Sequence, residues 1–347
     1  MAKKISYRVI VVGAGMIGQE MVKVLKQRNF PMSELKILAR SARKQVFGGV
    51  EYEVRETKDE EFNGFDLAFF AGTEGEKGAS VSFGPKAVKK GLVVIDNGQD
   101  FRMKKYQGKP VPLVVPEVNA EALKGHQGII ANPNCSTVQM VMAIYPLHKL
   151  ARIKRVWVAT YQAVSGTGTG AYQELQAQLR AWAEGKPLEV KEYPVQIAFN
   201  IIPQISSLSE KKKFEGYYLE EVKMIRETQK IMGDNRMKIT ATCVRVPVLN
   251  SHSEAITVEL EREVPVEEAR EALRKMPGVI LMDEPLKSVW PHPLIASGND
   301  ATYVGRVRKD TAVRKGLSLF CVSDNIRKGG ALNAVQIAEK MMEMNLI

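Results

Sequence analysis

Several residue types and patterns that mark specialised protein classes are scarce or missing in this sequence. The three cysteines, Cys135, Cys243 and Cys321, are too few and too scattered for a disulfide framework, which favours a reducing, cytoplasmic location. No CxxC pair occurs and the four histidines are far apart, so we predict no metal site. No apolar run approaches the roughly 20 residues that cross a bilayer. No segment near the start of the sequence has the features of a signal peptide.

The residues that are present describe a folded protein with two domains. The chain has 347 residues, of which 45% are apolar and 26% charged. The net charge of +11 permits nucleic acid, acidic lipid or small anions as ligands. The densest basic run, residues 211–213, is short and has no interleaved aromatic residues. We therefore expect neither nucleic acid nor membrane partners. Two explanations of the net charge stay open: small anionic ligands, or a basic surface that is simply solvated.

The first 133 residues alternate between strand-like and helical patterns. A parallel sheet covered by helices on both faces explains this alternation, so we predict a Rossmann-type α/β nucleotide domain. The expected strands are residues 7–12, 35–38, 67–70, 92–95 and 128–131, with helices after the first strand and at 85–91.

The pattern changes after residue 133. Longer strand-like runs at 156–162, 237–248 and 254–261 have fewer helices between them, which predicts an α+β domain with a mixed or antiparallel sheet. A final amphipathic helix follows at 329–347. We expect a nucleotide-binding domain formed by 1–133 and 329–347, and a catalytic and dimerisation domain formed by 134–328.

A glycine-rich turn links the first strand to the first helix. Gly13, Gly15 and Gly18 fit the GxGxxG pattern of dinucleotide-binding proteins. Glycine lets the backbone approach a pyrophosphate, and the N–H groups at the helix start, near Met16 and Ile17, favour an anion. A tight turn without a ligand is the less favoured alternative.

The end of the second strand indicates which dinucleotide binds. An NAD site normally has an acidic residue there for the ribose hydroxyls, whereas this chain has Arg40, Ser41 and Arg43. Guanidinium groups suit a 2′-phosphate, so we predict NADP. A plain surface role is nearly as good an interpretation for Arg43.

Cys135 lies in the polar segment NPNCST, after a strand and at the start of a helix. The helix dipole lowers a thiol pKa there, so we predict a nucleophile rather than packing filler. A thiolate beside a nicotinamide attacks an aldehyde, and a thioester remains after hydride leaves. His252, in a polar break between strands, is the best acid–base candidate. Cys243 and Cys321 lie in apolar strands and are expected to be buried.

Seven motifs follow one another along the chain: GxGxxG, DN-x-x-x-FRM, NPNCST, YQAVSGTG, YLEEVKM, RVPV followed by SE, and DNIRKGGALNAVQIAE. Together they resemble the aspartate-β-semialdehyde dehydrogenase family along essentially the whole chain. The family produces L-aspartate 4-semialdehyde from L-4-aspartyl phosphate with NADPH, early in the biosynthesis of lysine (through diaminopimelate), threonine and methionine. It forms homodimers, sometimes paired into tetramers.

The resemblance implies a role for individual residues. Cys135 would be the nucleophile, Gln162 would orient the intermediate, and His252 would be the acid–base. Arg245 would bind the substrate carboxylate, while Glu220 and Lys223 would contact the substrate amine and the phosphate. The remaining implied contacts are phosphate binding by Arg102 and Asn134 and cofactor binding by Ser165, Gly166 and Asn325.

The residue chemistry agrees with part of this assignment. Arg245 lies in a run that is almost free of charge, and a planar guanidinium binds a carboxylate in bidentate fashion. A structural salt bridge is its alternative. Glu220 and Lys223 share a helix face, which alone would favour a surface ion pair. Taken alone, Arg102 reads as a surface residue.

The sequence also departs from the family at the cofactor site. The glycine turn is one residue shorter than usual, and residues 71–75 and 97–100 lack the usual serines.

Two other functions are also weighed. One is an N-acetyl-glutamyl-phosphate reductase, with the same chemistry on a longer acid. The other is an NADP-binding redox sensor without turnover, which would need neither His252 nor Arg245.

Overall fold

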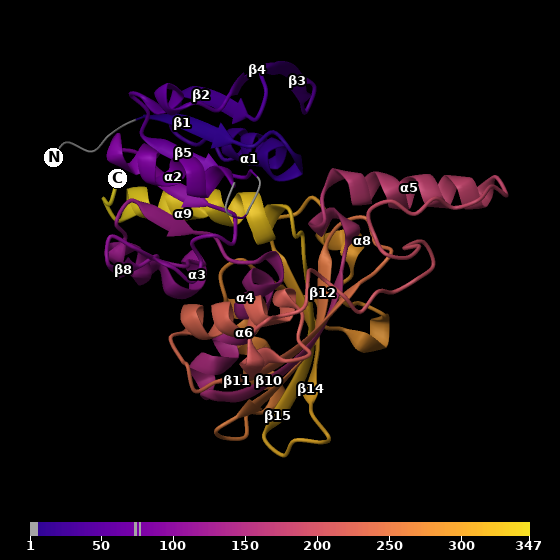
Figure 1. The fold of residues 1–347 in the computed structure, drawn as a ribbon. Helices are drawn as coiled ribbons and strands as arrows, with labels where there is room; N and C mark the ends of the chain where they lie inside the picture. The colour runs from indigo at the N-terminus through magenta and orange to yellow at the C-terminus, as the bar shows by residue number, and fades with distance from the viewer. Residues whose placement is uncertain (1–5, 73–74, 76–77) are drawn as a thin grey trace. The chain divides into compact units, whose positions relative to one another are not determined.

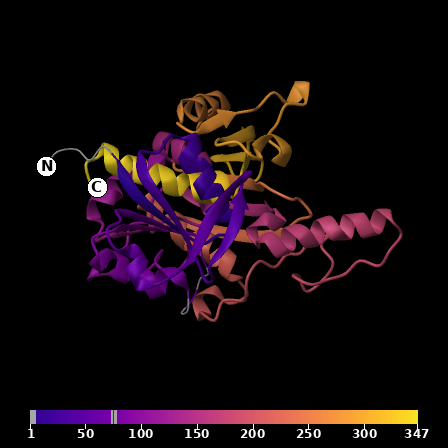
Figure 2. The same cartoon turned by 90° about the horizontal axis from the view of Figure 1, so that it is seen from above.

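The computed structural model describes residues 6–72, 75 and 78–347. The chain forms two compact units, Met1–Asn134 with Gly330–Ile347, and Cys135–Gly329. Figures 1 and 2 show the units from two directions. Each is described by itself below.

The first unit contains a largely parallel sheet, as predicted. Its described strands run in the order β3-β4-β2-β1-β5-β6-β9, and only the β3–β4 pair is antiparallel. That hairpin was not predicted, although Val50, Tyr52 and Val54 alternate with charged residues in β4, which is typical of a half-buried strand. The strands are β1 (Tyr7–Val12), β2 (Met32–Ala39), β3 (Arg43–Phe47), β4 (Val50–Glu56), β5 (Leu67–Phe70), β6 (Val93–Asp96) and β9 (Ile129–Ala131).

Helices cover both faces of this sheet. α1 (Met16–Gln27) and α9 (Leu332–Glu343) pack together in one apolar core with Val9 and Val11 of β1. α2 (Ala79–Lys89) packs against β5, β6 and β9, and it begins six residues before the predicted start at Pro85. Smaller elements are β7 (Lys105–Tyr106), β8 (Lys109–Pro110) and α3 (Pro116–Asn119). The predicted α/β class is confirmed for this unit.

The second unit contains a mixed sheet of longer strands. The described strands run in the order β11-β10-β12-β15-β14-β13, parallel at the two outer pairs and antiparallel between them. This confirms the predicted α+β architecture. The strands are β10 (Ile153–Gln162), β11 (Lys238–Arg245), β12 (His252–Leu260), β13 (Val279–Leu281), β14 (Thr302–Lys309) and β15 (Gly316–Ser323).

One face of this sheet is covered by helices. α4 (Cys135–Leu150), α6 (Leu219–Met232) and α7 (Val266–Lys275) pack against it, whereas α5 (Thr169–Ala183) extends away from the sheet (Figures 1 and 2). α8 (Pro293–Ala296) is a single turn beside β15. No helix in the described part of the chain has the length and apolar character needed to span a bilayer.

Candidate active site

The glycine turn of the first unit is shaped for close backbone approach. Gly13 has φ +119°, and a Cβ there would collide with the backbone of Ala71. A Cβ on Gly18 would collide with the carbonyl of Gly13, so the turn and α1 pack without side chains. Gly15 precedes α1, and a Cβ there would meet no atom of the described residues within 4 Å. The open space above Gly15, in front of the N–H groups of Met16 and Ile17, fits a pyrophosphate.

The three polar residues expected at the ribose lie on one exposed segment after β2. Arg43 donates from its guanidinium to the Ser41 carbonyl (3.1 Å) and to Gln45 Oε1 (3.0 Å), so it is held by its own loop. Arg40 forms no hydrogen bond or ion pair with any described residue. Arg40 is therefore the cation of this segment that remains available to a bound phosphate.

Hydrogen bonds join the two loops of the first unit that depart from the family pattern, residues 71–75 and 97–100. Asp100 accepts hydrogen bonds from the Gly75 N–H (3.1 and 3.2 Å) and from Ser80 Oγ (3.4 Å). Thr73 and Glu74 of the first altered loop lie outside the described residues.

Arg102 is not the surface residue that its local sequence indicates. Only 6% of it is exposed, and its guanidinium donates to the carbonyls of Asn132 (2.9 Å) and Asn97 (2.8 Å). Asn134 is also buried, and both residues belong to the first unit. The other predicted catalytic and substrate residues lie in the second unit.

In the second unit, adjacent strand ends bring Gln162 and Arg245 together as direct partners of β10 and β11. The Gln162 amide donates to Glu220 Oε1 (3.1 Å), and its oxygen accepts from Thr160 Oγ1 (3.0 Å). Glu220 is buried and forms an ion pair with Lys223 on α6 (3.4 Å), as their spacing predicts. The carboxylate of Glu220 therefore positions Gln162 through a hydrogen bond.

The backbone of Ala163 connects Arg245 with His252. Its carbonyl accepts from Arg245 Nη1 (2.6 Å), and its N–H donates to His252 Nδ1 (3.0 Å). Both side chains are buried, yet among the described residues Arg245 Nε and His252 Nε2 have no hydrogen-bond partner. A Cβ on Gly166 would lie 3.0 Å from Arg245 Nη1 and 3.1 Å from His252 Nε2. The absence of a side chain on Gly166 therefore leaves room beside both groups.

The hydrogen bond from Ala163 fixes the protonation of His252. Because Nδ1 accepts, the single proton of the neutral ring is assigned to Nε2. Burial, with a further contribution from the Arg245 charge, lowers the pKa of His252 to about 3, and Glu220 opposes this. The neutral imidazole therefore presents Nε2–H as a hydrogen-bond donor.

The three cysteines differ as expected. Cys135 is the first residue of α4 and is half-buried, and a Cβ on Gly329 would lie 2.7 Å from its Cβ. Cys243 and Cys321 are fully buried in strands, and burial raises the pKa of both thiols well above 9. They are core residues, as predicted.

Some residues that build this site carry no recognisable sequence signal. Ala163 acts only through its backbone, so its side chain gives no indication. Thr160 orients Gln162 but resembles any other strand threonine. The family resemblance implied Ser165 and Asn325, but not the hydrogen bond between them (3.0 Å), because they are far apart in sequence.

Comparisons with known proteins agree with this geometry. The family model described as "Semialdehyde dehydrogenase, NAD binding domain" matches residues 8–126, and the one described as "Semialdehyde dehydrogenase, dimerisation domain" matches residues 144–328. The chain is 49% identical to aspartate-semialdehyde dehydrogenase from Aquifex aeolicus, covering 98% of this chain and 99% of that one. It is 45% identical to the enzyme of the same name from Bacillus subtilis, covering 98% of each.

A solved structure gives the same result. Aspartate semialdehyde dehydrogenase II from Vibrio cholerae, complexed with ASA, matches with a TM-score of 0.89 and 39% identity, over 97% of this chain and 98% of that chain. Fold and site thus define a two-domain oxidoreductase with a nicotinamide-binding domain. More particularly, the chain belongs to the aspartate-semialdehyde dehydrogenase family. This supports the main hypothesis from the sequence rather than the reductase or sensor alternatives.

Proposed function

We propose that the chain catalyses the reversible, NADPH-dependent reduction of L-4-aspartyl phosphate to L-aspartate 4-semialdehyde through a thioester on Cys135. One observation carries this proposal. The buried guanidinium of Arg245 lies beside the Nε2–H of His252 without an ion-pair partner among the described residues. Two buried donors at one place, both lacking a protein acceptor, indicate an acidic ligand with a polar oxygen.

Arg245 is the anchor for the substrate carboxylate. Burying a charge without a partner is costly, and a ligand carboxylate removes that cost when it binds. The Ala163 carbonyl occupies one N–H of the guanidinium and leaves the Nε side for bidentate pairing. Glu220 and Lys223 are assigned to the substrate amine and the phosphate, with Arg102 and Asn134 as further phosphate ligands.

Cys135 begins the reaction. Its thiolate attacks the acyl carbon, the C–O bond to phosphate breaks, and inorganic phosphate leaves. The N–H groups at the start of α4 are assigned to the oxyanion, because the positive end of the helix dipole favours negative charge there. Gln162, held by Glu220 and Thr160, orients the acyl group.

His252 acts on the oxygen of the reacting carbonyl. Its Nε2–H donates a hydrogen bond to the oxyanion that forms on this carbonyl. When the hemithioacetal anion collapses to the aldehyde, the C–S bond breaks and the Cys135 thiolate leaves, so the oxygen needs no proton. The Ala163 N–H on Nδ1 keeps the ring in the tautomer that presents Nε2–H. The ring therefore begins each turn of the reaction as a neutral donor.

The pyrophosphate and ribose of the cofactor are assigned to the first unit. Gly13, Gly15 and Gly18 would hold the pyrophosphate, and Arg40 with Ser41 the 2′-phosphate. Ser165 and Gly166 of the second unit would hold the nicotinamide end, to which the family resemblance also assigns Asn325. NADPH, when bound, supplies the hydride. Arg40 supports NADP over NAD because no carboxylate takes its place at the end of β2. The product would feed lysine, threonine and methionine biosynthesis, and the cytoplasmic location stays a prediction.

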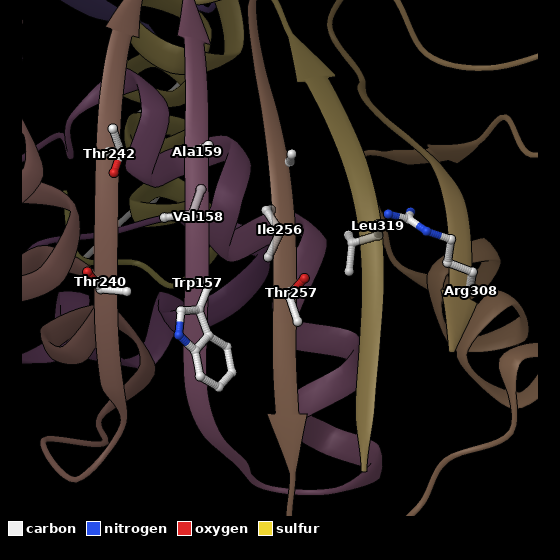
Figure 3. A pocket seen from close by; sticks show the side chains of 10 residues that line it. Trp157, Val158, Ala159, Thr240, Thr242, Ile256, Thr257, Arg308 and Leu319 are labelled. Atoms are coloured by element: carbon white, nitrogen blue, oxygen red, sulfur yellow. The ribbon is translucent and has the colours of Figure 1, made fainter. Parts of the chain in front are cut away.

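The second unit is assigned to dimerisation. The sheet face opposite α4 and α6 has a hollow of about 300 Å³, with Trp157 and Thr257 side by side on β10 and β12 (Figure 3). On the same face Tyr161 is 42% exposed and lies 6.3 Å from the Phe320 ring. We assign this face to a second copy of the chain, because the matching family model is a dimerisation domain.

Light scattering tests the homodimer. Trp157→Arg should halve the mass in dilute solution, whereas Glu271→Arg on the exposed side of α7 should not. A Trp157→Arg variant that keeps the wild-type mass would remove this face from the interface. A wild-type mass of four chains would instead identify the homotetramer.

A phosphate-dependent assay tests the function itself. Oxidation of aspartate semialdehyde should require inorganic phosphate and proceed faster with NADP than with NAD. N-acetylglutamate semialdehyde should react far more slowly, because its longer chain displaces the carbonyl from Cys135. Equal rates on the two semialdehydes would contradict the assignment. Binding of NADP without any turnover would favour the redox sensor.

A further inference from the structure

A closed group of hydrogen bonds lies behind His252 and is centred on Asn325. The Asn325 side chain is buried, with Oδ1 accepting from the Ser251 N–H (2.9 Å) and Nδ2 donating to Ser165 Oγ (3.0 Å). Both ends of this amide are thus engaged within the second unit. One end holds the backbone of the residue immediately before His252.

Ser251 has an unusual conformation for a serine. Its φ is +75°, in the left-handed region that favours glycine, and the residue is fully buried. Such a conformation persists only where the surrounding structure holds it. The N–H of Ser251 has one described acceptor, Asn325 Oδ1, so this hydrogen bond is the direct support for the strained residue.

The support is itself anchored by a chain of hydrogen bonds that begins at Ser165. Ser165 Oγ donates to Asn250 Oδ1 (3.0 Å), and Asn250 Nδ2 donates to Asp324 Oδ2 (2.8 Å). Asp324 also accepts from the backbone N–H groups of Gly298 (2.7 Å) and Ile326 (2.9 Å). Asn325 is therefore fixed in place before it holds Ser251.

The direction of the His252 ring depends on this arrangement. Among the described residues the ring has one hydrogen-bond partner, the Ala163 N–H, which donates to Nδ1. The turn at Ser251 sets the direction in which the chain enters β12, whose first residue is His252. If Ser251 relaxed to an ordinary conformation, the ring would leave the Ala163 N–H and Nε2 would no longer lie beside Gly166 and Arg245.

We propose that Asn325 is a positioning residue for His252, which holds Ser251 in its left-handed conformation and thereby directs Nε2 to the reacting oxygen. The proposal rests on the proposed function of His252. It differs from the cofactor contact that the family resemblance implies for Asn325. A cofactor contact affects cofactor binding, whereas a positioning role affects turnover.

Steady-state kinetics with matched variants separate the two roles. Asn325→Leu keeps the size but removes the acceptor, and it should lower kcat by about 30-fold while KM for NADPH changes less than about threefold. Asn325→Asp keeps an acceptor for the Ser251 N–H and should retain more activity. A raised KM for NADPH with unchanged kcat would overturn the proposal.

A second substitution, Ser251→Gly, tests whether the kcat lost in Asn325→Leu can be recovered. Glycine adopts φ near +75° without strain, so this variant alone should stay within about twofold of wild type. Combined with Asn325→Leu it should recover at least about fivefold in kcat, because the backbone no longer needs Asn325 to hold it. Additive losses in the double variant would show that Asn325 does not act through Ser251.

A spectroscopic readout keeps the proposal separate from the proposed function. In ¹⁵N-histidine spectra, His252 should be the Nε2–H tautomer in the wild type and a mixture in Asn325→Leu. A His252→Gln variant assigns the signal. An unchanged tautomer in Asn325→Leu would overturn the positioning role. An inactive wild type with the expected spectra would overturn only the proposed function.

Discussion

Two rows of side chains on the helix-covered face of the second sheet are equally buried but differ in chemistry. The front row, Arg245, Gln162 and His252, lies where the strands begin or end. The back row, Cys243, Thr160, Glu254 and Cys321, lies two positions further along the same strands, in direct register across β11, β10, β12 and β15. Side chains two apart on a strand point to the same face, so both rows meet the same helices.

The difference lies in whether the protein itself supplies an acceptor for the hydrogen-bond donors of each row. In the back row, the Cys321 thiol donates to Glu254 (3.6 Å), and burial keeps both thiols protonated. In the front row, Arg245 Nε and His252 Nε2 find no described partner. Burial alone therefore makes the thiols of the back row inert. Buried donors that lack a protein acceptor, as in the front row, mark a ligand site.

Cysteine substitutions test this contrast with the largest expected effect. Cys135→Ser should lower kcat by about 10³-fold or more, because a serine hydroxyl is a far weaker nucleophile at neutral pH. Cys243→Ala and Cys321→Ala should keep kcat within about threefold but lower the free energy of unfolding by about 1–2 kcal/mol. Turnover assays and urea titrations of all three variants measure this. Equal loss of kcat in a back-row variant would break the comparison.

The pH profile of His252 gives the next effect. His252→Gln should lower kcat by about 10²-fold. With a pKa of about 3, the wild-type ring stays neutral throughout the range pH 5–8, so kcat should show no acidic limb near 6.5 that belongs to this residue. A limb near 6.5 that disappears in His252→Gln would show that the ring is charged in the working enzyme.

Arg245 tests the front row through substrate binding. Arg245→Lys retains the charge but loses bidentate geometry, so KM for the semialdehyde should rise by about 30-fold with a smaller change in kcat. Arg155→Lys, on the same sheet but paired with Glu259 at the surface, is the matched control and should change neither constant. An unchanged KM in Arg245→Lys would remove Arg245 from the substrate site.

The sequence predicts those parts of the molecule whose cause is local. The glycine turn is visible because Gly13, Gly15 and Gly18 are neighbours between a strand and a helix. Cys135 can be proposed as a nucleophile for the same reason, because its polar NPNCST segment also lies between a strand and a helix. The β3–β4 hairpin was missed although the alternation of apolar and charged residues in β4 is itself a local signal of a strand.

The front row shows where local reasoning ends. Arg245 and His252 can be proposed from residue type, but their connection through the Ala163 backbone depends on strand register, which residue types do not encode. The buried position of Arg102 likewise depends on the carbonyls of residues 97 and 132, which accept hydrogen bonds from its guanidinium. These contacts follow from the tertiary fold, because backbone groups carry no residue identity.

The last expected effect comes from the back row and appears as a pH dependence of stability. Burial raises the pKa of Glu254 to about 8 from an ordinary 4.5, against the effect of hydrogen bonds from Gln139 and Cys321. The folded state thus holds this proton more tightly than the unfolded chain. Its contribution is complete below pH 4.5 and is lost as the pH rises to about 8, by up to about 4 kcal/mol. Glu254→Gln should remove that slope in urea titrations at pH 5, 6.5 and 8, whereas the exposed control Glu271→Gln should keep it. A slope that persists in Glu254→Gln would mean that the back row is open to water, and the distinction between the two rows would then fail.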